Sequence, residues 1–227
     1  MISVAKSWNS KQARLKEIIL KPDAFTETIA LLLEMHSLVH ASQMSDSEVI
    51  TYEDQLWEGL EPGVFSSQVK NVGSTIAWNL WHLTRIEDIT ANILIAEDSQ
   101  VISSDNWLEK MKASVLDTGN AMSDREIADF SWKIDMAELK NYRIEVGRKT
   151  RHIINSLRPE SMKKKVNAEG IKRILLEGGV TEAEQSRWLL DFWSKKTIAG
   201  IILMPITRHQ VVHLNDSFKL KSKLSNR

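Results

Sequence analysis

Apolar residues recur at three- and four-residue steps along most of this 227-residue chain, a spacing typical of amphipathic α-helices. Alternating β-branched residues are scarce, and only nine Gly and four Pro interrupt the pattern. The sequence therefore predicts an all-α protein. A four-helix bundle with short extra helices in the connections is the most economical arrangement of its long segments.

Four segments carry the clearest helical pattern. They cover residues 22–41, 75–97, 135–157 and 197–221. Ser74 and Asp135 are predicted to cap the second and third helices, and Thr181 is predicted to open a shorter helix that leads to Trp193. Pro205 lies inside the fourth segment, so we expect that helix to kink, break or begin there.

The domain organisation follows from the same pattern. Residues 22–222 are predicted to form a single domain, with an irregular stretch that contains short helical pieces over 98–134. Residues 1–21 are basic and weakly patterned, so we expect an N-terminal extension that is a solvated tail or a short peripheral helix. Residues 223–227 are predicted to form a C-terminal tail.

Composition excludes several classes of protein. Lys and Arg together number 30, as do Asp and Glu, so no basic surplus favours a nucleic-acid partner. The eight Trp are therefore better explained by core or pocket packing than by base stacking. The absence of Cys excludes disulfides and thiolate metal sites. The chain shows no signal-peptide pattern and no bilayer-length apolar stretch, so we expect a cytoplasmic protein without a membrane partner.

Histidine placement is the strongest chemical signal. Five of the six histidines lie on apolar helix faces, namely His36, His40, His82, His209 and His213, whereas His152 lies in a polar run. The pairs 36/40 and 209/213 are each four residues apart, which puts both imidazoles on one helix face, about 5–6 Å apart at Cβ. Such a pair can converge on one metal ion. The alternative is a hydrogen-bonded core histidine, which is the usual role of a single inward imidazole.

The sequence around the last pair excludes one familiar class of metalloenzyme. It reads Arg208-His-Gln-Val-Val-His213, so the glutamate that serves as general base in H-E-x-x-H peptidases is missing. The chain also contains no P-loop, G-x-G-x-x-G or G-x-S-x-G motif.

Several strings carry a family resemblance over residues 24–222. They are IAWNLWHLTRIED (76–88), DTGNAM (117–122), RWLLDFW (187–193), TIAG (197–200) and MPITRHQVVHLN (204–215). With these strings the chain resembles the DinB/YfiT-like superfamily of four-helix-bundle metalloproteins, which includes thiol-dependent S-transferases. The resemblance implies a divalent ion held by His82, His209 and His213, and a homodimer. It leaves His36 and His40 unassigned, and we expect them, with Trp78, to line the cavity or to supply an extra ligand or proton carrier.

Three nitrogen ligands leave a coordination position open, as in catalytic zinc sites. Zinc or nickel is the expected ion, with iron or manganese as alternatives. The ion would lower the pKa of a bound thiol or water, which would then react with an electrophilic small molecule.

Polar residues near the expected ligands are candidates for supporting roles. Asp88, Asn215 and Asp216 are predicted to accept hydrogen bonds from the ligand histidines. Glu87, Arg85 and Arg208 are candidate catalytic residues, and either arginine could recognise a carboxylate on the thiol or substrate.

Three functions remain open from the sequence. The first is a metal-dependent transferase that uses a low-molecular-weight thiol, and the second is a metal-dependent hydrolase in which water replaces the thiol. The third is a non-catalytic metal-binding bundle, which a fourth protein ligand such as His36 or His40 would favour.

Overall fold

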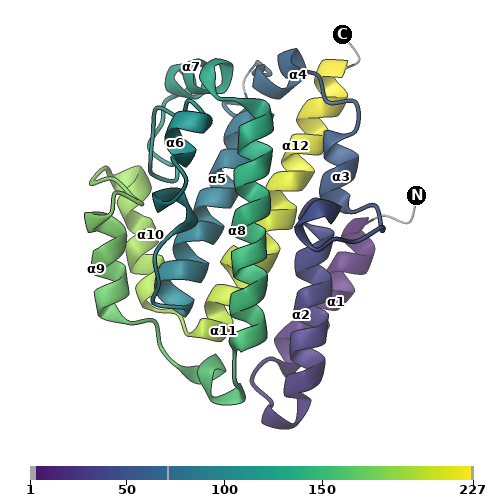
Figure 1. Cartoon of the computed structure of the whole chain (residues 1–227), viewed down its shortest axis with the longest axis vertical. Helices are drawn as coiled ribbons and strands as arrows, with labels where there is room; N and C mark the ends of the chain where they lie inside the picture. The colour runs from purple at the N-terminus through teal and green to yellow at the C-terminus, as the bar shows by residue number, and fades with distance from the viewer. Residues whose placement is uncertain (1–3, 71, 226–227) are drawn as a thin grey trace.

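The computed structural model describes residues 4–70 and 72–225. Within these ranges, regular structure consists of helices and one isolated β-bridge between Lys165 and Thr197 (Figure 1). The all-α prediction is therefore confirmed for this part of the chain. Asn71 and the two chain ends lie outside the described residues, and with them parts of the predicted connection, extension and tail. Across the described ranges, no helix combines the length and the apolar character needed to cross a membrane.

Four long helical segments lie side by side (Figure 1). They are α2 (Phe25–Leu38), α5 (Ile76–Asp88) with its π-helical continuation (Ile89–Ile95), α8 (Met136–Ser156), and the succession α11 (Ile198–Ile201), π-helix (Ile202–Arg208) and α12 (His209–Ser225). Helix α5 packs against both α8 and α12, and α2 packs against α8 and the second π-helix. The faces that meet are apolar, so the core lies between these segments.

Short helices fill the connections, as predicted for 98–134. The α-helical ones are α3 (Tyr52–Trp57), α4 (Pro62–Ser66), α6 (Trp107–Lys110), α7 (Asp124–Lys133), α9 (Ala168–Leu176) and α10 (Glu184–Ser194). The 3₁₀ turns are Pro22–Ala24, Ser42–Met44, Val101–Ser103 and Pro159–Lys163. Helix α10 and His82 of α5 line the same cavity.

The predicted helix caps are partly correct. Asp135 caps α8 and accepts hydrogen bonds from the backbone N–H groups of Ala137 and Glu138. Helix α5 is capped by Thr75, whose side chain accepts from Trp78 N at 2.9 Å, so the prediction of Ser74 was wrong by one residue. Thr181 does not cap α10, which begins at Glu184 without a side-chain cap.

Pro205 does not break the last helix, because the helix widens into a π-helical segment that accommodates the proline. The wider turn leaves backbone carbonyls without their ordinary helical donors, and nearby side chains supply donors instead. Thr207 Oγ1 donates to Ile202 O at 2.9 Å, and Gln210 Nε2 donates to Pro205 O at 3.3 Å. The helix therefore continues into α12, which runs to Ser225 where a tail from residue 223 was predicted.

The basic N-terminal segment is a helix that packs into the core, not a solvated tail. Helix α1 (Val4–Ile18) contacts α2 and the second π-helix, and it buries Trp8, Leu15 and Ile18. These positions share one helix face, a pattern that the surrounding lysines obscured. Lys11 and Arg14 form ion pairs with α2 at Glu34 and Glu27.

Candidate metal centre

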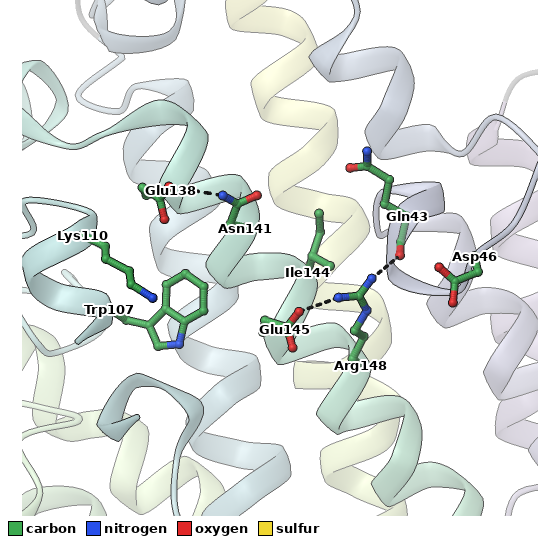
Figure 2. Close-up of a pocket in the computed structure, with 9 residues that line it drawn as sticks. All are labelled: Gln43, Asp46, Trp107, Lys110, Glu138, Asn141, Ile144, Glu145 and Arg148. Carbon is green, nitrogen blue, oxygen red and sulfur yellow. Dashed lines mark hydrogen bonds and ion pairs between the residues drawn. The ribbon is translucent and has the colours of Figure 1, made fainter. Parts of the chain in front are cut away.

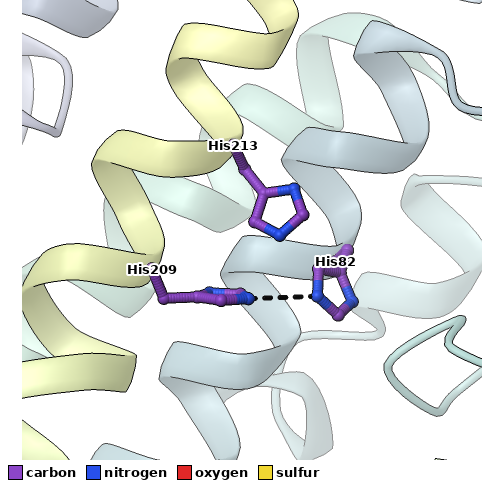
Figure 3. Close-up of side chains that lie close together, drawn as sticks. All are labelled: His82, His209 and His213. Atoms are coloured by element: carbon purple, nitrogen blue, oxygen red, sulfur yellow. Dashed lines mark hydrogen bonds between the residues drawn. The ribbon is translucent and has the colours of Figure 1, made fainter.

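Helix packing brings the three histidines that the resemblance singled out to one place (Figure 3). His82 comes from the middle of α5, and His209 and His213 lie one turn apart at the start of α12. One ring nitrogen from each residue lies within 4.8 Å of the others. The Nε2 atoms of His82 and His209 are 3.1 Å apart. This group could hold a metal ion.

Hydrogen bonds orient two of these three rings. His82 Nδ1–H donates to the backbone carbonyl of Thr118 at 2.8 Å, and His213 Nδ1–H donates to Asn79 Oδ1 at 3.2 Å. Each Nε2 then carries a free lone pair, which is the state that binds a metal. Trp78 stacks on His82 with ring centroids 4.8 Å apart, but it is not one of the residues that line the cavity next to His82.

Burial keeps the three histidines neutral. Loss of solvation, with a smaller contribution from His213, lowers the pKa of His82 to about 3. Burial lowers the pKa of His213 to about 4, and that of His209 falls well below its ordinary value for the same reason. At neutral pH the rings are therefore unprotonated, and no proton has to leave before an ion binds.

The pair His82–His209 needs something between its facing nitrogens. His82 Nε2 has only a lone pair to offer, so His209 must either donate a proton to it or share a cation with it. A tetrahedral ion with Zn–N bonds of about 2.0–2.1 Å separates its nitrogens by roughly 3.3 Å, which is close to the 3.1 Å between these two atoms. The donor set and its spacing therefore fit a divalent ion.

A second buried group consists of His36, His40 and Glu87. The Nε2 atoms of His36 and His40 lie 2.9 and 3.0 Å from separate oxygens of the Glu87 carboxylate, and all three side chains are fully buried. These groups could also hold a metal ion. Burial alone would raise the pKa of Glu87. The neighbouring His40 and the hydrogen bonds from both histidines outweigh this effect and hold the pKa of Glu87 well below its usual range.

The two groups differ in what an ion would add. An ionised carboxylate can only accept hydrogen bonds, so His36 and His40 turn their Nε2–H toward Glu87 and satisfy it without an ion. In the His82 group the free lone pairs face one another instead. His36 and His40 belong to this second group and not to the group around His82, so their predicted role as extra ligands stays a prediction. Glu87 makes no hydrogen bond with His82, His209 or His213.

The structure places Arg85 and Asp88 in a different network. Arg85 Nη1 donates to Asp88 Oδ2 at 2.9 Å and to Tyr142 at 2.8 Å, and Asp88 also accepts from the backbone N–H groups of Val101 and Ile102. These fully buried residues anchor the loop that follows the first π-helix. Asp88 therefore supports the fold rather than a ligand histidine, because six residues after His82 the helix presents another face.

The remaining predicted partners also lie elsewhere. Asn215 accepts a hydrogen bond from Tyr52 at 2.6 Å, and Asp216 pairs with Lys219 at 2.8 Å. Arg208 is exposed and lines a surface hollow beside α1. The partners that do hold two of the three histidines, Asn79 and the Thr118 carbonyl, were not predicted. Asn79 could have been found, because it precedes His82 by one helical turn. The Thr118 carbonyl could not have been found, because every residue has a backbone carbonyl.

A cavity of about 170 Å³ opens beside His82 and His209. Its other lining residues are Ile86, Asn120, Trp188, Leu189, Phe192, Trp193, Met204 and Pro205. A larger groove of about 520 Å³ lies along α8, lined by residues that include Trp107, Glu145 and Arg148 (Figure 2). That groove is polar, contains none of the three histidines, and pairs Glu145 with Arg148 across its floor.

Comparison with known proteins adds no identification. No protein-family model matches the chain, and neither does any curated protein sequence. The geometry of the site therefore carries the argument about function.

Proposed function

We propose that the chain is a metal-dependent enzyme with the four-helix-bundle fold of the DinB/YfiT-like superfamily, in which His82, His209 and His213 hold one divalent ion. The observation that carries the proposal is the pair of hydrogen bonds to Thr118 O and Asn79 Oδ1, which turn two Nε2 lone pairs toward the third histidine. Zinc or nickel suits three imidazoles, with iron or manganese as alternatives.

The same residues and the cavity define the chemistry. A divalent ion at three imidazoles lowers the pKa of a thiol or water that occupies its open position. Among the described residues, the group around His82 contains no fourth protein ligand, and the cavity lies directly beside His82 and His209. A small substrate in this cavity would lie within reach of that position and would be shielded by aromatic side chains. We propose transfer or addition of a low-molecular-weight thiol.

Hydrolysis is the second candidate, and one observation favours it. The cavity walls contain no Arg or Lys, and the two arginines expected to recognise a carboxylate, Arg85 and Arg208, lie elsewhere. A thiol that carries carboxylates would find no partner there, whereas water needs none. A homodimer and a cytoplasmic location stay predictions from the resemblance and composition.

Elemental analysis of purified protein tests the metal centre. We expect about one ion per chain, and loss of at least nine-tenths of it in His82→Ala, His209→Ala or His213→Ala, because two imidazoles hold an ion far more weakly than three. His152→Ala, which removes an exposed histidine, should keep the ion. Full retention in all three variants would refute the assignment.

Glu87→Gln separates the two buried groups. Provided that circular dichroism shows a folded protein, this variant should retain its ion. Loss of the ion in Glu87→Gln, with retention in His213→Ala, would place the metal at His36, His40 and Glu87 instead.

Cobalt-substituted protein separates the two chemistries. A thiol that binds the ion adds a sulfur-to-cobalt absorption band, and this band should be absent in His82→Ala. Hydrolysis of test esters that added thiol leaves unchanged would favour the water-based alternative.

A further inference from the structure

The cavity beside the histidines is lined almost entirely by apolar and aromatic side chains. Helix α10 supplies four of them, Trp188, Leu189, Phe192 and Trp193, and the π-helix around Pro205 supplies Met204 and Pro205. Ile86 of α5 closes the side next to His82. Apart from the two histidines and the indole N–H groups of the two tryptophans, Asn120 is the one described lining residue with a polar side chain.

Among the residues that the structure describes, no charged side chain lines this cavity. Lys196 Nζ lies over the Phe192 ring at 4.1 Å from the centroid, but Lys196 is not a lining residue. An ionic group inside the cavity would therefore lose its hydration without gaining a charged side chain as a partner.

The size of the cavity limits what can enter. Its volume is about 170 Å³, and an apolar cavity of about 150 Å³ holds a molecule of benzene. Sites that enclose drug-sized ligands are larger, about 300–1,000 Å³.

We infer that the substrate presents a small, uncharged, apolar group of about benzene size to the histidine centre. The inference rests on the proposed function only in identifying the cavity as the substrate site. It narrows the proposed function, because the residues that line the cavity offer a carboxylate no charged side chain. Such a group would lie beside His82 Nε2 and His209 Nε2, where an activated nucleophile would meet it.

Calorimetric titration of metal-depleted protein tests the inference with three probes of one shape. Toluene is neutral, benzoate carries a negative charge and benzylammonium a positive one. We expect toluene to bind at least ten-fold more tightly than either ion. Equal binding of benzoate, or no binding of toluene, would overturn the inference.

A matched pair of variants locates the binding. Met204→Lys puts an ammonium group at the cavity wall. The affinity for toluene should therefore fall at least ten-fold, and benzoate should bind more tightly than toluene. Leu176→Lys adds the same charge at a residue that is 82% exposed and outside the cavity, and it should keep the original preference. An unchanged preference in folded Met204→Lys would place toluene elsewhere and overturn the inference.

The two proposals can fail separately. Selective toluene binding by a protein that holds no metal on elemental analysis would refute the proposed function and leave this cavity as an apolar binding site. One ion per chain without selectivity for toluene would refute this inference alone.

Discussion

At the scale of single residues, the partners of the histidines decide what each imidazole can do. His82 and His213 donate their Nδ1 protons to fixed oxygens, so their Nε2 atoms are available as ligands. His36 and His40 instead turn Nε2 toward Glu87, whose carboxylate accepts from both. Histidine pairs with the same spacing can thus have different roles, because the neighbouring hydrogen-bond acceptor determines which ring nitrogen carries the proton.

Asn79→Leu should weaken metal binding about 10- to 100-fold without removing any ligand. The change deletes the oxygen that accepts from His213 Nδ1, so the ring loses both its orientation and its preferred tautomer. Competition with a chelator of known affinity measures the change. Asn141→Leu, an exposed position on α8, is the matched control and should leave the affinity unaltered. Equal affinities for the two variants would contradict the assigned role of Asn79.

At the scale of elements, one departure from regular α-helix lies directly beside the candidate centre. The π-helix around Pro205 lies immediately before His209. Gln210 Nε2 donates to Pro205 O within this helix and to Leu83 O, which joins the helix to α5. Pro205 alone indicated an interruption, but whether the helix would break or widen depended on donors from elsewhere in the fold.

Gly147→Ala should destabilise the protein by about 1–3 kcal/mol, although alanine ordinarily stabilises a helix interior by roughly 1 kcal/mol. A Cβ at Gly147 in α8 would lie 2.7 Å from Met44 Cγ and 2.8 Å from His40 Nδ1. His40 cannot easily move, because Glu87 holds its other nitrogen.

Urea denaturation of the two proteins measures this effect. Gly63→Ala in α4 is the control, since nothing lies within 4 Å of the Cβ it would add. A Gly147→Ala protein as stable as the wild type would show that His40 is not packed against α8.

At the scale of the whole molecule, buried neutral histidines couple folding to pH. In the unfolded chain histidine titrates near pH 6.5, whereas burial lowers the folded pKa of His40, His82 and His213 to about 3–4. Below pH 6.5 the unfolded chain binds protons that the folded chain does not. Acid therefore favours unfolding over the range from pH 6.5 down to about pH 4.

Metal-depleted protein should accordingly lose stability as pH falls from 7 to 5, by up to about 1.4 kcal/mol per pH unit for each buried histidine. The lowered pKa of Glu87 acts in the same direction at lower pH, because the stability it contributes is lost as the carboxylate takes up a proton. Denaturation in urea at pH 7, 6 and 5 measures the slope. His152→Gln, at an exposed position, should leave the slope unchanged, and a flat profile would contradict the burial of neutral histidines.

The sequence predicted the features that depend on interactions between residues close together in the chain, and it predicted fewer of those that depend on distant residues. The positions of the long helices and the inward orientation of five histidines follow from apolar spacing, which is a local property of the chain. The caps were less certain, as Ser74 and Thr181 show, because several neighbouring residues can serve. A short peripheral helix was one alternative for residues 1–21, but the packing of α1 into the core was not predicted, because its few apolar positions become significant only against α2.

The sequence alone therefore determined where the long helices lie and which imidazoles could be ligands, since both depend on neighbours within one or two helical turns. Only the tertiary structure decided which histidines meet, because His82 and His209 are 127 residues apart and come together through the packing of α5 on α12. It also decided that Asn79 and Thr118 hold the rings, that Arg85 and Asp88 serve another network, and that α10 closes an apolar cavity. Each of these outcomes depends on how helices rotate and pack against one another, which local spacing does not specify.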